Sequence, residues 1–162
     1  MITVHILTPD ATIGVDMLIH LMRQYREHLL RVVEVKRPIR HDRGSDYAFI
    51  AIFREPGTIG QLVAFVHPWA TSWGPGSGGT GSSGFARMQS YIEDEGIEPE
   101  RHEWWEIPEE FQSPISGDSI AEMRRGWSAF LEEFHLPYLF EYGVEYPLNE
   151  KWEELDRNWP SR

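Results

Sequence analysis

Two apolar segments separated by a turn constrain the fold of this chain more than any other feature. Tyr47–Phe53 and Leu62–His67 are rich in β-branched and aromatic residues, and the intervening Arg54–Gly60 contains the proline and glycines of a turn. The pattern predicts an antiparallel hairpin. Because both runs are almost continuously hydrophobic, we expect the hairpin to lie at the centre of a sheet with both of its faces covered.

Three amphipathic segments can provide that cover. Apolar residues recur at three- and four-residue steps over 15–32, which predicts a long helix. A shorter helix is predicted around 85–92, with its end near Gly96. A third is predicted over 120–134, where Ser119 and a glutamate three residues later have the spacing of a capping box.

The remaining elements complete the pattern of an α+β protein. Ile2–Leu7, His102–Ile107 and Tyr138–Tyr146 are predicted strands, and Asn149–Asn158 is a predicted terminal helix. The order of elements favours an α+β fold with a mainly antiparallel sheet, a central hairpin at about 47–67, and three to four helices packed on the sheet.

The length of the chain favours one domain. With 162 residues it is long enough for one domain and short for two, so residues 1–162 are predicted to form a single unit. The Gly/Ser-rich stretch 74–84 has the composition of a linker, but neither flanking half offers a sufficient core by itself. We therefore interpret 74–84 as a long loop within the domain.

Composition also narrows the expected location. The chain has no cysteine, which excludes disulfides, thiol nucleophiles and cysteine-ligated metals. Met1–Asp10 lacks the basic region of a signal peptide. The longest unbroken apolar run, Ala48–Phe53, is far shorter than the roughly 20 residues that a membrane span needs. We expect a soluble, cytoplasmic protein that does not associate with membranes.

Charge is distributed very unevenly along the chain. Residues 1–81 carry eight Lys/Arg and seven Asp/Glu, whereas residues 82–162 carry seven and nineteen, which accounts for the formal net charge of −11. Nine acidic residues and one base, Arg101, fall within residues 93–110, here called the acidic segment. Direct nucleic-acid binding is not expected, because phosphate contacts need a basic surface. The charge favours a basic protein as partner.

Two adjacent tryptophans lie within the acidic segment. Aromatic anchors surrounded by charge are typical of protein interfaces, although a solvated acidic face with inward-packed indoles has the same pattern. The chain is predicted to be a non-catalytic interaction protein of the immunity-protein or inhibitor type, as phages or plasmids encode, which binds a basic protein. The residues predicted to bind are Glu98, Glu103, Trp104, Trp105, Glu106 and Glu109.

Two alternatives stay open. The first is an enzyme or small-ligand protein, with 74–84 as a lid over a pocket near His67, the best single candidate for a general base. Its substrate would be an anion held by the basic residues Arg37, Arg40 and Arg43. The second is a structural subunit of a larger assembly, and a homo-oligomer is compatible with either alternative. No spacing identifies a catalytic group, so none is assigned.

Motif evidence for a cofactor or a metal is weak. Gly76–Gly81 matches G-x-G-x-x-G, but it does not follow a strand by a tight turn, and Gly84 is not followed by the Lys-Ser/Thr of a P-loop. His102 begins an H-E-x-x sequence whose fifth position is Glu106 rather than histidine. We expect neither a cofactor nor a metal.

Overall fold

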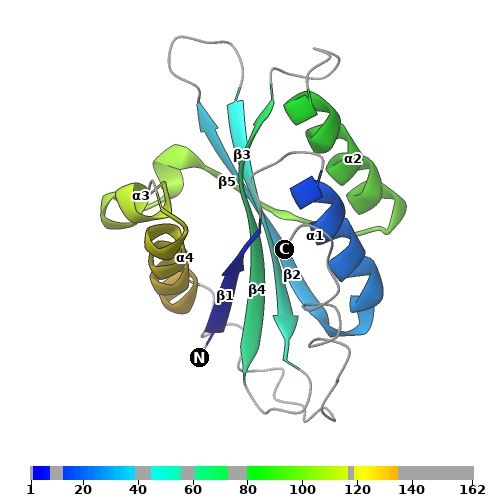
Figure 1. The fold of residues 1–162 in the computed structure, drawn as a ribbon, viewed down its shortest axis with the longest axis horizontal. Helices are drawn as coiled ribbons and strands as arrows, with labels where there is room; N and C mark the ends of the chain where they lie inside the picture. Colours follow the sequence, from blue (N-terminus) through cyan, green and yellow to red (C-terminus); the bar gives the residue numbers. More distant parts are fainter. Residues whose placement is uncertain are drawn as a thin grey trace.

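The structure, a computed structural model, describes residues 2–7, 13–38, 45–55, 61–72, 80–116 and 119–134. The strands form a five-stranded sheet in the order β1-β4-β3-β2-β5 (Figure 1). In chain order the elements are β1 (Ile2–Ile6), α1 (Ile13–Gln24), the 3₁₀ helix η1 (Arg26–His28), β2 (Leu29–Pro38), β3 (Ser45–Arg54), β4 (Leu62–Ser72), α2 (Thr80–Asp94), β5 (Glu100–Glu103), the 3₁₀ helix η2 (Trp104–Glu106), α3 (Glu109–Ile115) and α4 (Ile120–Phe134).

The sheet is built around the predicted hairpin. β3 lies at its centre and pairs antiparallel with both β2 and β4, while β1 and β5 are added in parallel at the two edges. The hairpin is confirmed, since Ile50 pairs with Val66 and every residue of Ala48–Phe53 is fully buried. The expectation of an α+β fold with a mainly antiparallel sheet is confirmed as well.

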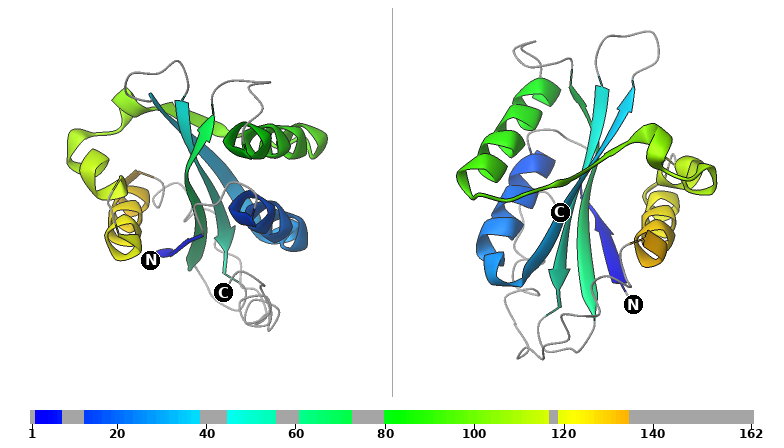
Figure 2. Two further views of the ribbon diagram at one scale, coloured as in Figure 1. Left: turned by 45° about the horizontal axis from the view of Figure 1, so that its top comes forward. Right: turned by 180° about the vertical axis from the view of Figure 1, so that it is seen from behind.

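Helices cover both faces of the sheet. α1 and α2 pack on one face, and α3 and α4 pack on the other (Figures 1 and 2). Successive side chains of β3 alternate between the two cores, so that Phe49 and Phe53 pack beneath α1 and α2 whereas Ile50 and Ile52 pack beneath α3 and α4. Burial on both faces explains why this strand is hydrophobic at every position.

Two predicted helix boundaries are confirmed by their capping groups. Ser119 Oγ accepts the backbone N–H of Glu122 at 3.1 Å and begins α4. After α2, Gly96 has a φ of 65°, and the backbone N–H of Ile97 donates to the carbonyl oxygen of Ile92 at 3.0 Å. A left-handed residue at this position is a common helix end, and glycine adopts it without steric cost.

The helix predicted over 15–32 is wrong in its second half. α1 ends at Gln24, and the chain continues through η1 into β2. In β2, Val33 and Val35 pack into the core beneath α3 and α4, whereas Val32 packs into the opposite core. The same apolar residues fit both a helical and an alternating pattern over this stretch. Long-range pairing with β3 decides between them, because ladder hydrogen bonds and burial on both faces outweigh a local periodicity.

Two other predicted boundaries also need correction. The loop predicted over 74–84 ends earlier, because Thr80–Gly84 already belongs to α2 and Gly84 is buried. Glycine costs a helix up to about 1 kcal/mol relative to alanine, a cost that packing of α2 on the sheet offsets. The strand predicted over His102–Ile107 is Glu100–Glu103 instead, followed at once by a 3₁₀ turn.

α3 was missed by the sequence analysis. It has seven residues with Pro114 inside, which is too short for a helical periodicity to be recognised. The predicted strand Tyr138–Tyr146 and the predicted helix Asn149–Asn158 lie outside the described residues. So does the part of the Gly/Ser-rich stretch that precedes α2.

Candidate functional site

The acidic segment follows one edge of the sheet. From the end of α2 it forms β5, passes through η2 and enters α3, so the chain crosses from one helical layer to the other (Figure 2). β5 pairs in parallel with β2, with Val33 opposite Glu100 and Lys36 opposite Glu103. The predicted binding residues therefore follow one another along this edge and the turn beyond it.

The two adjacent tryptophans have opposite surroundings. Trp104 is half-buried and packs against the core beneath α3 and α4. Trp105 is 77% exposed, and among the described residues the other exposed large hydrophobic side chains are Ile13 at 43% and Ile120 at 51%. A large, stiff indole in this position is typical of an interface anchor.

The turn that presents Trp105 is held by hydrogen bonds on both sides. Glu106 Oε2 accepts the backbone N–H of Glu103 at 2.6 Å, and the Glu103 side chain accepts the backbone N–H of Glu106 in return. From α3, Gln112 Nε2 donates to the carbonyl oxygen of Ile107 at 2.8 Å. Trp105 thus lies on a turn that is held by hydrogen bonds, which limits its conformational freedom before any contact forms.

Trp104 is fixed to the body of the protein by an aromatic cluster, the tryptophan cluster, which consists of Trp69, Trp104, Trp127 and Arg37. The ring centroid of Trp69 lies 5.5 Å from that of Trp104 and 6.1 Å from that of Trp127. The guanidinium carbon of Arg37 lies 3.9 Å from the Trp69 ring centroid and 5.8 Å from that of Trp104. These are cation–π contacts, which are stronger when partly shielded from water.

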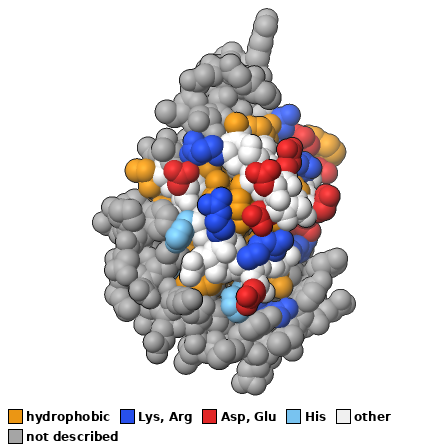
Figure 3. All heavy atoms as spheres, turned by 90° about the vertical axis from the view of Figure 1, so that its right-hand side faces the viewer, with side chains coloured by type: hydrophobic (Ala, Val, Ile, Leu, Met, Phe, Trp, Pro, Cys, Tyr) orange, Lys and Arg blue, Asp and Glu red, His pale blue; other side chains and the backbone are white. Residues whose placement is uncertain are grey.

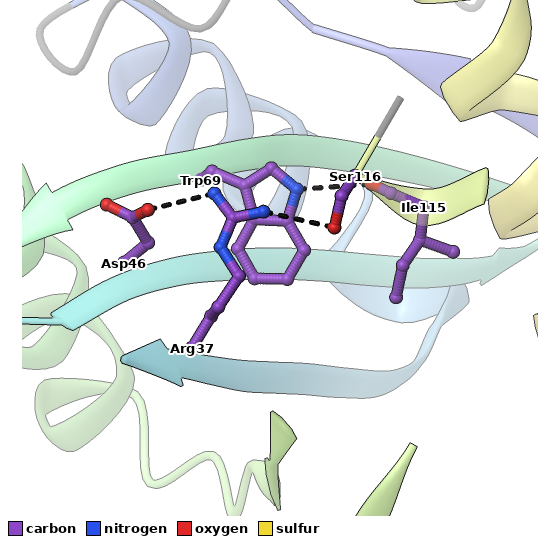
Figure 4. Close-up of polar contacts among 5 residues, drawn as sticks. All are labelled: Arg37, Asp46, Trp69, Ile115 and Ser116. Atoms are coloured by element: carbon purple, nitrogen blue, oxygen red, sulfur yellow. Dashed lines mark hydrogen bonds and ion pairs between the residues drawn. The ribbon is translucent and has the colours of Figure 1, made fainter. Parts of the chain in front are cut away.

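Polar bonds hold the same cluster in place (Figure 4). Arg37 donates to Asp46 Oδ2 at 2.8 Å and to Ser116 Oγ at 3.0 Å. Trp69 Nε1 donates to the carbonyl oxygen of Ile115 at 3.1 Å. Because Ile115 and Ser116 lie at the end of α3, these bonds connect α3 to three strands of the sheet. The η2 turn, which lies between β5 and α3, is therefore supported from both ends.

A β-bulge gives Trp69 its orientation. The pairing of β3 with β4 shifts register between Tyr47 and Phe49, and Trp69 has a φ of 40°, which is uncommon for a residue other than glycine. Regular alternation from His67 would direct Trp69 toward α1 and α2, but its ring packs on the opposite core. Such a conformation costs roughly 1–3 kcal/mol, which the contacts of the tryptophan cluster offset.

Few carboxylates of the acidic segment form an ion pair with a residue that the structure describes. Glu100 pairs with Arg31 of β2, and Arg101 Nε pairs with Glu34 Oε2 at 3.3 Å. Glu103 and Glu106 are exposed and form the capping box. Six further side chains are exposed and form no ion pair with any residue that the structure describes: Glu93, Asp94, Glu95, Glu98, Glu109 and Glu110.

The basic stretch predicted to bind an anion has partners within the chain at its described end. Arg37 is bonded to Asp46 and Ser116, as noted above. Across the described ranges, no ion pair joins Lys36 or Arg37 to a carboxylate of the acidic segment, although Lys36 lies opposite Glu103 in the pairing of β2 with β5. Arg40 and Arg43 lie outside the described residues, so their role as an anion site stays a prediction.

His67, the best catalytic candidate in the sequence, is completely buried in β4 opposite Phe49. Solvent does not reach its ring in this conformation, and neither of the two cavities described next is lined by it. The predicted pocket near His67 therefore gains no support from these cavities.

The face formed by α1 and α2 carries charges of both signs. Basic and acidic side chains are interspersed on it (Figure 3), and Arg87 Nε of α2 pairs with Asp16 Oδ1 of α1 at 3.1 Å. A cavity of about 500 Å³ between these helices is lined by both signs of charge, including Arg23 and Glu95.

A smaller cavity, of about 250 Å³, lies between β2, β3, β5 and α2. The side chain of Glu34 within it is 6% exposed and accepts Gln89 Nε2 at 2.6 Å and Arg101 Nε at 3.3 Å. Burial raises the pKa of Glu34 above its usual value, and the bonds from Gln89 and Arg101 oppose that rise. Tyr47 and Phe85, with ring centroids 4.3 Å apart, form an aromatic wall.

The Glu34 cavity was not predicted from the sequence. A signal was present in Val33-Glu34-Val35-Lys36, where polar residues alternate with valines as on a strand that is only partly covered on one face. The helical interpretation of the preceding residues concealed that signal. The other cavity residues come from distant parts of the chain, and only the folded sheet brings them together.

Comparisons with known proteins give no guide to the function of this chain: no family model, no curated protein and no solved structure matches it. Within the described ranges, no helix is long and apolar enough to cross a membrane. Nor does the described part of the chain contain a group of three or more histidine, aspartate or glutamate side chains placed to hold a metal ion. Function must therefore be inferred from the geometry of the chain itself.

Proposed function

We propose that this protein is a non-catalytic interaction protein whose acidic segment binds a basic protein partner, with Trp105 as the central anchor. The observation that carries the proposal is the 77% exposure of Trp105 on a turn fixed by a capping box. Exposed carboxylates before and after it in the chain supply the charge complementarity.

The indole can provide much of the binding free energy. Tryptophan buries roughly 150–250 Å² when it is covered, and at about 25 cal/mol per Å² the exposed part of Trp105 corresponds to about 4 kcal/mol before the costs of association. Interface tryptophans often account for about 2 kcal/mol or more when replaced by alanine. The fixed turn reduces the entropy lost on binding, so we expect Trp105 to contribute more than this lower value of about 2 kcal/mol.

The carboxylates favour rapid encounter with a positively charged surface. Charges at an interface influence the association rate more than the final affinity, and their effect is screened by salt over a distance of roughly 10 Å at 0.1 M. Eight exposed carboxylates of the acidic segment, Glu103 and Glu106 among them, form no ion pair with a described residue and are available for this steering. Association with a basic partner should therefore slow steeply as salt is added.

The class of partner follows from the same chemistry. A protein that binds nucleic acid must present a basic surface to phosphates, and a small acidic protein with an aromatic anchor is suited to cover such a surface. We therefore propose that this chain is an inhibitor of the immunity-protein type, a kind of protein that phages or plasmids can encode, and that its target is a basic nucleic-acid-binding protein.

The experiment uses the whole chain as bait and then measures kinetics with the purified partner. Stopped-flow association is recorded at low and at physiological salt for the wild type and for the triple variant Glu98→Gln, Glu103→Gln and Glu106→Gln. We expect the triple variant to associate several-fold more slowly at low salt, and the difference to shrink as salt rises. An unchanged association rate at low salt would rule out the proposal.

A second triple variant distinguishes an effect of the acidic segment on the association rate from an effect of net charge alone. Glu27→Gln, Glu132→Gln and Glu133→Gln remove the same number of exposed carboxylates outside the acidic segment. This control should associate at nearly the wild-type rate. Equal slowing in both triple variants would show that net charge alone acts, and would contradict a role for the acidic segment.

A further inference from the structure

The Glu34 cavity adjoins the proposed interface. Glu103 lines the cavity and also caps the turn that carries Trp105. Arg101, the single base of the acidic segment, lines the cavity as well. Glu103 therefore belongs both to the cavity and to the proposed interface.

The cavity holds a buried carboxylate whose bond to a guanidinium is incomplete. Arg101 contacts Glu34 Oε2 through Nε at 3.3 Å, and its side chain remains 60% exposed. A guanidinium forms its strongest bond to a carboxylate through two parallel N–H groups at about 2.7–2.9 Å. A second guanidinium with better geometry can therefore replace that of Arg101 on Glu34.

The other walls suit the same group. The rings of Tyr47 and Phe85 offer an aromatic surface on which a planar cation stacks. Gln89 holds the second oxygen of Glu34 at 2.6 Å, which fixes the plane of the carboxylate. At about 250 Å³, the space suits one side chain rather than a large ligand.

The cavity is also lined by His102 and by Lys36, whose positive charge opposes entry of a cation. Glu103 lies opposite Lys36 in the pairing of β2 with β5 and offsets its charge. When another cation enters and the Arg101 guanidinium leaves Glu34, the positive charge of Arg101 no longer opposes that cation. The total charge facing the ligand is then negative.

We propose that the Glu34 cavity is a recognition pocket for one arginine side chain of the basic partner, an inference that rests on the proposed function. The incoming guanidinium bonds to Glu34, stacks on Tyr47 and Phe85, and displaces Arg101 toward solvent. Arginine is favoured over lysine because its planar group uses both the carboxylate and the aromatic wall.

The pocket is tested first without the partner. The protein, labelled with ¹⁵N, is titrated with N-acetyl-arginine methylamide and with the citrulline analogue, which has the same shape but no charge. We expect saturable shifts of the amide signals of Glu34, Gln89 and Arg101 with the arginine probe, and binding at least about tenfold weaker with citrulline. Equal binding of the two probes, or no shift at these residues, overturns the inference.

Two variants make the test specific. Glu34→Gln should lower the affinity for the arginine probe at least about tenfold. Arg101→Ala should raise that affinity several-fold, because the competing guanidinium is gone. Glu133→Gln and Arg124→Ala are the matched controls at exposed positions on α4 and should leave binding unchanged. A purely structural Glu34–Arg101 pair does not predict tighter binding in Arg101→Ala, so weaker binding in that variant overturns the inference.

Partner binding distinguishes this inference from the proposed function. Phe85→Leu keeps an apolar contact of α2 and removes one of the two rings of the aromatic wall. This variant replaces Glu34→Gln as the test if Glu34→Gln does not fold, and it should weaken binding of both the probe and the partner. If Trp105→Ala abolishes partner binding while Glu34→Gln and Phe85→Leu have no effect on it, the pocket is refuted and the proposed function stands. If Glu34→Gln and Phe85→Leu weaken binding of the partner and Trp105→Ala does not, the pocket is supported and Trp105 is not the anchor.

Discussion

Replacing each of the two adjacent tryptophans by alanine, in separate variants, should have opposite effects on stability and on binding. Trp104 is half-buried, lies edge-on to Trp69 at 5.5 Å and contacts Arg37, whereas Trp105 is 77% exposed. Replacing a fully buried tryptophan by alanine lowers the free energy of unfolding by about 3–5 kcal/mol. Because Trp104 is only partly buried, we expect Trp104→Ala to lower it by about 2–3 kcal/mol. For Trp105 the expected loss is below about 0.5 kcal/mol.

Urea unfolding followed by far-ultraviolet circular dichroism measures both losses without depending on tryptophan fluorescence. With a slope of about 2 kcal/mol per M, Trp104→Ala should lower the unfolding midpoint by about 1 M, and Trp105→Ala should leave it nearly unchanged. Each variant is the control for the other, because the residue types are the same and the positions are adjacent. Equal destabilisation by both variants, or a larger loss for Trp105→Ala, would refute the assignment of one indole to the core and the other to a partner.

Three further predictions concern the packing and the charge of the core. Gly126→Ala should lower the free energy of unfolding, measured in urea, by about 1–3 kcal/mol. The reason is that the Cβ of the alanine would lie 2.5 Å from the carbonyl carbon of Pro114, where α4 meets α3. A loss near zero would contradict this packing. Arg37→Lys should lower the free energy of unfolding by about 1–2 kcal/mol, because a lysine keeps the charge but cannot stack on Trp69 while it donates to two acceptors. Unchanged stability would show that the tryptophan cluster accepts any cation at this position. Glu34→Gln should change the dependence of stability on pH. Burial raises the Glu34 pKa in the folded state, so this carboxyl contributes stability that is complete below its usual pKa of 4.5 and is lost as pH rises toward the raised value. Wild-type stability relative to the variant should therefore fall as pH rises through this window, and a constant difference would contradict a raised pKa.

The central hairpin could be predicted because its burial is visible in the sequence itself. A strand covered on both faces is hydrophobic at every position, as Ala48–Phe53 is, and the short length of the run and the turn that follows favour a strand over a buried helix. β2 could not be separated from α1 in the same way. Leu29 and Val32 continue the three- and four-residue spacing of the helix, and only the pairing with β3 converts them to a strand.

The candidate site was predictable in part, for a similar reason. The acidic segment and its tryptophan pair are local in sequence, so both could be singled out without a structure. The difference between Trp104 and Trp105 depends on the η2 turn and on the bulge at Trp69, which directs that ring toward Trp104. The Glu34 cavity depends on contacts from β2, α2 and β5, and no local pattern encodes them.

The most direct test of the account is the affinity of the purified partner for Trp105→Ala compared with Ile120→Ala. Ile120 is the matched control because it is also a large, exposed hydrophobic side chain, 51% exposed, and lies on α4 away from the acidic segment in sequence. Isothermal titration calorimetry should show affinity reduced about 30-fold or more for Trp105→Ala and changed less than about twofold for Ile120→Ala. An unchanged affinity for Trp105→Ala, or an equal loss in both variants, would contradict the claim that Trp105 anchors a basic partner.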